Sequence, residues 1–194
     1  MTTSGSQEQA ISAELRGRLA ASFELVNSLI RLRLRRAETP ESRADLSWLL
    51  DIVTALGMLQ GRLASADPGA FAAYLVDVGG FWRRVAGERA AIVVEAQRFR
   101  IPEQRAATLA LIAHELLRDA VESAPEAGLS LELRLRRTGE GRGELRLIHQ
   151  SGAERVRDLW LATGLADQLG GALSESADEV RLEFALDTPT PPLN

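Results

Sequence analysis

Apolar residues recur every three to four positions in the first third of the chain, which predicts two long amphipathic helices. The first helix is expected over residues 7–37 and the second over residues 41–64. In the segment that separates them, Pro40 disfavours helical geometry at Thr39 and suits the first turn of a helix. A connection this short makes the two helices antiparallel neighbours.

The second helix carries more apolar surface than a two-helix hairpin can enclose. Its stripe consists of Leu46, Leu49, Leu50, Val53, Leu56 and Leu63. A second copy of the hairpin is the simplest cover, because two hairpins related by a twofold axis form a four-helix bundle. We therefore expect a homodimer. The alternative is that the stripes pack on the C-terminal part of the same chain.

The pattern becomes mixed after residue 70. Helices are expected at 71–86, 102–123 and 154–169, strands at 91–97, 129–137 and 143–149, and a β-hairpin at 172–186. The predicted fold class is α+β, with an N-terminal antiparallel helical hairpin followed by an α/β sandwich. The expected domains are residues 7–66 and residues 70–187, and the proline-rich tail at 188–194 is expected to be disordered.

Composition narrows the possible partners and the compartment. The net charge of −4 argues against a general nucleic-acid binder. The absence of cysteine excludes disulfides and thiolate metal sites, and no run approaches the roughly 20 apolar residues that span a bilayer. We expect a cytoplasmic protein without a membrane partner. The run of Arg31, Arg33, Arg35 and Arg36 could dock an acidic surface, although an exposed helix face is the default interpretation.

Two C-terminal segments resemble the nucleotide-binding (Bergerat) domain of sensor histidine kinases. They are A-H-E-L-L-R-D-A-V-E-S-A at 113–124 and L-A-D-Q-L-G-G-A-L-S-E-S-A-D-E-V-R-L-E-F-A-L at 165–186. The first motif of that family usually reads N-E-L-x-x-N-A-x-x-H-A, and its last helix is followed by a Gly-Gly turn and a β-hairpin. This resemblance implies an ATP-domain fold for the second half of the chain.

The helical part is similar to the dimerisation and phosphotransfer hairpin of a cytoplasmic kinase subfamily, so the resemblance covers almost the whole chain. N-S-L-I-R-L-R-L-R-R-A-E-T-P-E-S-R-A-D-L at 27–46 matches the pattern S-S-L-L-R-L-Q-A-R-R-x-x-D-P-E-A-R-x-x-L. The phosphoacceptor motif of that subfamily is H-R-V-K-N-N-L. Aligned without gaps, its histidine falls on Gly17, its arginine on Arg18, and its asparagine pair on Ala21 and Ser22.

The departures from the family concern the residues that do its chemistry. Phosphoryl transfer to an imidazole needs a nucleophilic nitrogen, and Gly17 offers none. The metal-binding asparagine is replaced by Asp119, and the adenine and phosphate loops correspond to residues 149–152 and 156–159, where Gly152 alone matches. The resemblance therefore implies a degenerate kinase with no catalytic residue, no metal and no ATP cofactor.

Four residues could retain some chemistry. Glu115 and Asp119 lie one helical turn apart on the same face and could hold a nucleotide or Mg²⁺, although such a pair is more often a solvated face. The two histidines, His114 and His149, could serve as cryptic phosphoacceptors. We expect His114 to be partly buried in its helix.

Three classes of function remain open. The favoured one is a catalytically inactive two-component signalling protein that docks the receiver domain of a response regulator, or a cognate kinase, as an adaptor or sequestering regulator. Its contact residues would be Arg18, Ser22, Val26 and Asn27 on the first helix. The second class is a histidine phosphotransferase or a weak ATP-dependent kinase. The third is an anti-sigma-type regulator whose partner lacks a receiver domain.

Overall fold

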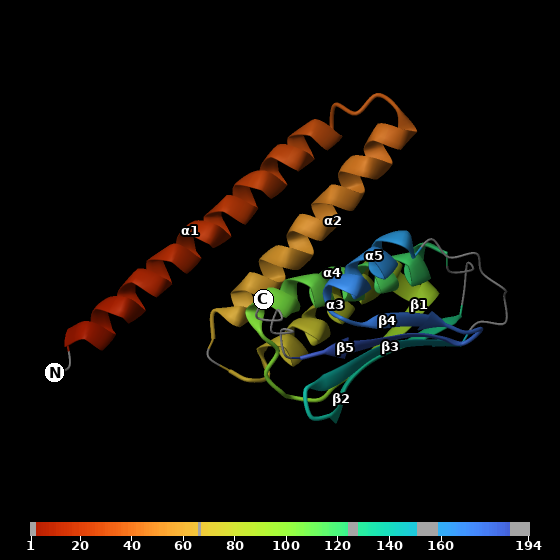
Figure 1. Cartoon of the computed structure of the whole chain (residues 1–194). Helices are drawn as coiled ribbons and strands as arrows, with labels where there is room; N and C mark the ends of the chain where they lie inside the picture. The colour runs from red at the N-terminus through yellow and green to blue at the C-terminus, as the bar shows by residue number, and fades with distance from the viewer. Residues whose placement is uncertain (1–2, 66, 124–127, 151–158, 187–194) are drawn as a thin grey trace, which may run out of the picture. The chain divides into compact units, whose positions relative to one another are not determined.

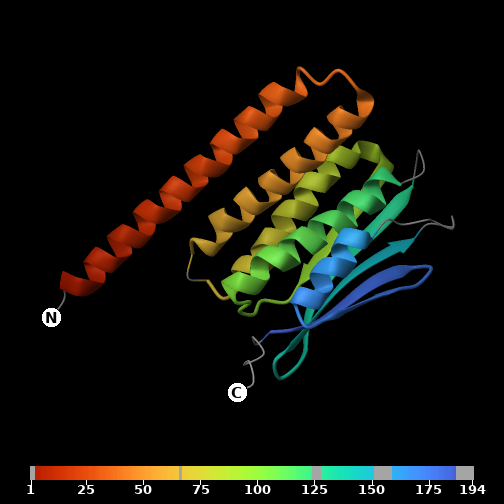
Figure 2. The same ribbon diagram turned by 45° about the horizontal axis from the view of Figure 1, so that its top comes forward.

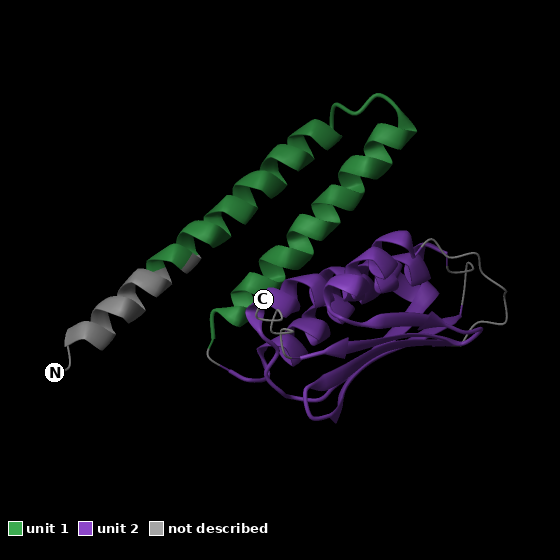
Figure 3. Cartoon of the chain, viewed as in Figure 1, with its two compact units in different colours: residues 1–66 green, residues 67–194 purple. Residues whose placement is uncertain are grey.

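The chain divides into two compact units, residues 1–66 and residues 67–194 (Figure 3). The computed structural model describes residues 3–65, 67–123, 128–150 and 159–186. The tail that we expected to be disordered, 188–194, lies outside the described residues. Among the helices in the described ranges, none is long and apolar enough to cross a membrane.

Unit 1 is a hairpin of two long helices, α1 (Thr3–Leu34) and α2 (Pro40–Leu63) (Figure 1). The turn between them is fixed by Thr39, whose side chain accepts a hydrogen bond from the Ser42 N–H at 3.1 Å. This cap and Pro40 in the first turn are the signals that favour a helix start. The expected antiparallel hairpin is confirmed, but α1 ends earlier than predicted because the chain tightens there, with the Arg36 N–H bonded to the Arg33 carbonyl.

In the described part of unit 2 there are three helices, α3 (Ala70–Ala86), α4 (Glu103–Glu122) and α5 (Trp160–Gln168), and a short 3₁₀ turn, η1 (Gly87–Arg89). Its strands are β1 (Ala90–Ala96), β2 (Leu129–Gly139), β3 (Arg142–Gln150), β4 (Ala172–Glu175) and β5 (Glu179–Ala185). They form one sheet in the order β1-β2-β3-β5-β4, in which only the β1–β2 pair is parallel among the described strands. Helices α3, α4 and α5 lie side by side on one face of this sheet (Figure 2). The predicted α+β fold class is confirmed.

The helix-covered face of the sheet forms the core of unit 2. Alternate residues of β2 and β5 point into it, as the period-two pattern of the sequence predicted. The buried residues of these two strands are Leu129, Leu131, Leu133, Leu135, Val180, Leu182 and Phe184. The turn before β4 needs its glycines, because Gly170 has a φ of +57° and a Cβ on Gly171 would lie 2.3 Å from the Glu183 carbonyl oxygen.

The other face of the sheet carries a network of ion pairs. Glu144 on β3 is the centre of this network and is only 5% exposed. Its two carboxylate oxygens contact Arg146 at 2.8 Å and Arg181 at 2.6 Å. Because Arg146 and Arg181 stand directly opposite each other on β3 and β5, Glu144 offsets the repulsion between the two guanidinium groups.

Candidate functional site

The position that aligns with the phosphoacceptor lies on the open surface of α1. Gly17 is exposed, and no heavy atom lies within 4 Å of where its Cβ would stand. Its neighbour Arg18 extends into solvent and pairs with Glu14 at 2.6 Å. The surface therefore has room for an imidazole at this point, and the sequence places glycine there.

The four residues expected to contact a partner do not share one environment. Arg18, Ser22 and Val26 are exposed, and the Ser22 hydroxyl donates a hydrogen bond to the Arg18 carbonyl at 2.9 Å. Asn27 is half-buried, and its side-chain oxygen is enclosed without a hydrogen-bond partner. Arg18, Ser22 and Val26 thus lie on the surface of α1, whereas the side-chain oxygen of Asn27 is buried.

Ser22 and Val26 belong to an exposed stripe on α1 that we call the side stripe. Leu15, Leu19, Ser22 and Val26 follow one another at helical spacing, and the three apolar members are 61%, 41% and 42% exposed in chain order. A row of this kind on a surface helix indicates contact with another molecule.

The acidic pair on α4 lies one helical turn apart, on a surface that is more covered than the solvated face that the sequence favoured. Glu115 and Asp119 are half-buried. Arg118 approaches Glu115 at 3.7 Å and Glu122 at 3.0 Å. This guanidinium offsets part of the negative charge that would attract Mg²⁺. Within the described residues, no three metal-ligating side chains gather in one place.

His114 is fully buried, so the expectation of a partly buried side chain underestimated its enclosure. Its Nδ1 accepts a hydrogen bond from Trp82 Nε1 at 3.3 Å, and the two rings lie 5.2 Å apart. Burial, with a smaller contribution from Arg118, lowers the pKa of His114 to about 4. The imidazole is therefore neutral at physiological pH and inaccessible to a phosphodonor in the folded protein.

His149 is buried as well, near the end of β3. It is 1% exposed and stands opposite Leu131 of β2. Its backbone N–H donates a hydrogen bond to the backbone carbonyl of Asp178 at 2.9 Å. The neighbouring residues that align with the nucleotide loops, Ser151, Gly152 and 156–158, lie outside the described residues. Leu159, which follows them, is buried directly before α5.

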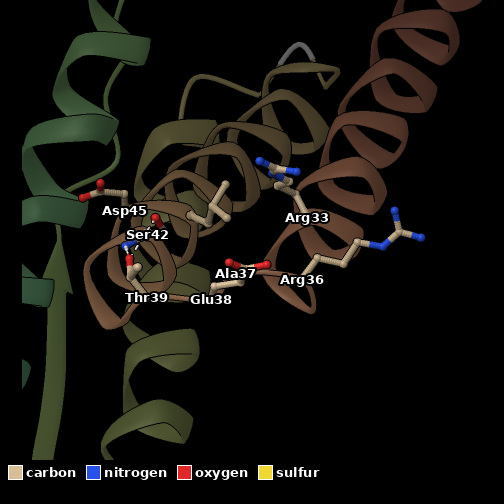
Figure 4. Close-up of a pocket in the computed structure, with 8 residues that line it drawn as sticks. Arg33, Arg36, Ala37, Glu38, Thr39, Ser42 and Asp45 are labelled. Carbon is tan, nitrogen blue, oxygen red and sulfur yellow. Dashed lines mark hydrogen bonds between the residues drawn. The ribbon is translucent and has the colours of Figure 1, made fainter.

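A hollow of about 510 Å³ lies at the turn of the hairpin (Figure 4). Arg33 and Arg36 line it from the end of α1, and Thr39, Ser42 and Asp45 line it from the start of α2. The guanidinium group of Arg36 points away from Asp45 in this view. No sequence motif indicated this hollow, because it arises where the chain reverses.

Several solved histidine kinases have a similar backbone. The EL346 blue-light activated histidine kinase of Erythrobacter litoralis aligns with a TM-score of 0.66 at 16% identity, over 84% of this chain and 60% of that one. The histidine kinase domain of the same protein aligns with a TM-score of 0.63 at 19% identity, over 93% of each chain. The histidine kinase AdeS of Acinetobacter baumannii aligns with a TM-score of 0.50 at 11% identity, over 76% of this chain and 82% of that one.

No family model matches the sequence, and no curated protein matches it either. At these low identities the structural likeness concerns the fold. The chain thus spans 60% of the first of these kinases and matches the histidine kinase domain nearly end to end. A helical hairpin followed by a five-stranded sheet under three helices is therefore the fold of a histidine kinase core, from the phosphotransfer hairpin through the catalytic domain.

Proposed function

We propose that this chain is a histidine kinase-like protein of two-component signalling that transfers no phosphoryl group itself and acts by docking a receiver domain or a cognate kinase. The observation that carries the proposal is Gly17, which stands exposed on α1 at the position onto which the resembling acceptor motif aligns its histidine. Both histidines of the chain are buried in unit 2. A protein with this arrangement keeps a docking helix and has no accessible imidazole to phosphorylate.

The docking surface that we propose is the side stripe of α1 with Arg18 beside it. Arg18 is a hydrogen-bond donor whose side chain is 75% exposed, so it is available to a carboxylate of the partner. Ser22 and Val26 supply a small, flat contact next to it. Loss of the acceptor imidazole leaves this surface unchanged, so a receiver domain could be held without being phosphorylated or dephosphorylated.

We also propose that the chain forms a homodimer through its hairpin. Leu15, Leu19 and Val26 on α1 and Leu49 on α2 are each at least 40% exposed in a single copy. A second hairpin that covers them would remove this apolar area from water, at about 25 cal/mol for each Å². The side stripe is then shared between two roles, and the following experiment separates them.

Titration calorimetry with a panel of receiver domains from the same organism tests the docking. Ser22→Arg should abolish binding, because a long charged side chain displaces the partner from the side stripe. Ser28→Arg is the matched control, since Ser28 is an exposed serine on the same helix whose hydroxyl also bonds the carbonyl four residues earlier. Light scattering separates the two roles: a Ser22→Arg variant that keeps the oligomeric state of the parent but no longer binds the receiver domain assigns Ser22 to docking, whereas a variant with the mass of a single chain assigns it to the dimer interface. Equal binding by Ser22→Arg and the parent would refute this docking surface.

A residual enzyme is the second candidate, and the acidic pair on α4 favours it. Glu115 aligns with the glutamate that the kinases use near the transferred phosphate, and Asp119 offers an oxygen ligand for Mg²⁺. The enzyme would still need an acceptor, and the nearest imidazole in sequence, His114, is enclosed in the core. Nucleotide binding by the chain would favour a residual enzyme over a docking protein.

A further inference from the structure

The C-terminal half of α1 carries a second row of exposed leucines, on the face turned away from α2. Phe23, Asn27, Ile30 and Leu34 form the half-buried inner row of this half. Leu25, Leu29 and Leu32 follow the same spacing two residues later, which rotates them by about 200° around the helix axis. They are 61%, 56% and 56% exposed, respectively. We call this row the outer stripe.

Arginines are concentrated at the end of α1 and in the turn after it, next to the outer stripe. Arg31, Arg33, Arg35 and Arg36 are all exposed, and residues 25–37 contain no acidic side chain. The whole protein has a net charge of −4, so this positive segment stands out against an acidic molecule. Arg36 lies in the turn that follows α1, and its side chain extends away from Asp45 and Ser42 (Figure 4).

The proposed dimer leaves most of this stripe uncovered. The side stripe that would pack in the four-helix bundle runs through Leu19 and Val26, and Val26 lies about 100° around the axis from Leu25. Leu25 and Leu32 therefore stay on the outside of a bundle built on the side stripe. Their apolar area needs another cover, or it remains in water at a cost in solubility.

The chemistry of the outer stripe fits a lipid surface. Leucines that lie between arginines on one helix face can enter the boundary of the acyl chains, while the arginine stems lie along them and hold the guanidinium groups at phosphate level. Each arginine near an anionic surface adds attraction.

We propose that residues 25–36, which are the end of α1 and the start of the turn after it, bind the surface of an anionic lipid bilayer, with the outer stripe entering the headgroup region and Arg33, Arg35 and Arg36 contacting lipid phosphates. The sequence led us to expect no membrane partner because it has no spanning run. A helix that lies in the plane of the interface needs no such run, so the lack of a spanning helix among the described residues does not bear on this binding.

Flotation of the full-length protein with vesicles tests the proposal. The protein should float with vesicles that contain about 30% phosphatidylglycerol, should stay in solution with pure phosphatidylcholine, and should be released at about 0.5 M salt. Leu25→Gln combined with Leu32→Gln should weaken flotation at least about tenfold, since two apolar contacts are removed. The matched control is Val76→Gln on α3, an equally exposed apolar residue outside the stripe, which should float like the parent.

Circular dichroism and light scattering establish that the double variant folds and keeps the oligomeric state of the parent. Absence of the parent from anionic vesicles would overturn the proposal, as would unchanged flotation of the double variant. Failure of the parent protein to bind vesicles, together with loss of receiver-domain binding in the double variant, would show that the outer stripe is a protein interface and that the lipid proposal is wrong. Vesicle binding and receiver docking are measured separately, so either can fail alone.

Discussion

The indole N–H of Trp82 donates to Nδ1 of His114 across 3.3 Å, which ties α3 to α4 inside the core of unit 2. His114 stands where the resembling kinases carry the first asparagine of their motif. Because the ring packs against Trp82 and is 0% exposed, it serves the core at a position that belongs to a nucleotide site in the kinases. His114 thus contributes to the packing between α3 and α4 in the core of unit 2.

The pKa of His114 makes the stability of the protein depend on pH. Above about pH 6.5 the imidazole is neutral in both the folded and the unfolded chain. Between about pH 6.5 and about pH 4 the imidazole is protonated in the unfolded chain but stays neutral in the folded chain. Stability is therefore lost as the pH falls through this window, by about 3 kcal/mol at its lower end. In His114→Gln, which keeps an acceptor for Trp82 but does not titrate, denaturant unfolding between pH 7 and pH 4 should show a loss smaller by this amount. Identical pH dependence of the two proteins would show that His114 is protonated in the fold.

Arg105 at the start of α4 should be essential to the stability of unit 2. Its side chain is buried, and its Nη1 donates to the carbonyls of Leu169 and Ala185, each at 2.7 Å. Arg105→Met fills similar space but removes the donor from two carbonyls, which should lower the free energy of unfolding by about 3 kcal/mol. Arg84→Met, at an exposed arginine of α3, should change it by less than about 0.5 kcal/mol. Urea unfolding measures the free energy of unfolding of the two variants. Equal losses in Arg105→Met and Arg84→Met would show that the buried hydrogen bonds of Arg105 do not stabilise unit 2.

The fold was predictable because its periodicities are strong and local. The three-to-four spacing in α2 and the alternation of leucines in β2 each point to one structure. Pro40 and the Gly170-Gly171 turn located the breaks between elements. The resemblance to kinases then ordered these elements into a known architecture.

The environment of the candidate residues was harder to predict, since it depends on contacts distant in sequence. The enclosure of His114 requires Trp82, and the burial of Arg105 requires carbonyls contributed by the segments around Leu169 and Ala185. The outer stripe was present in the sequence as leucines at 25, 29 and 32. Only the placement of α2 against the opposite face identified it as exposed.

The proposed dimer can be broken by a charge on α2. Leu49→Asp places a carboxylate where a second hairpin would bury it, and an unpaired buried charge is costly, so light scattering should show the mass of a single chain. Val76→Asp on α3, also at an exposed apolar residue, should leave the dimer intact. A parent that is already a monomer at micromolar concentration would contradict the four-helix bundle.

The most direct measurement is a calorimetric titration of the purified protein with millimolar Mg-ATP, followed on the same sample by incubation with radiolabelled ATP. The proposal that the chain neither binds ATP nor transfers a phosphoryl group predicts no saturable heat and no label on the protein. Saturable binding that is lost in Asp119→Ala and kept in the exposed control Asp167→Ala, together with label on His114 or His149, would contradict it and establish an active kinase.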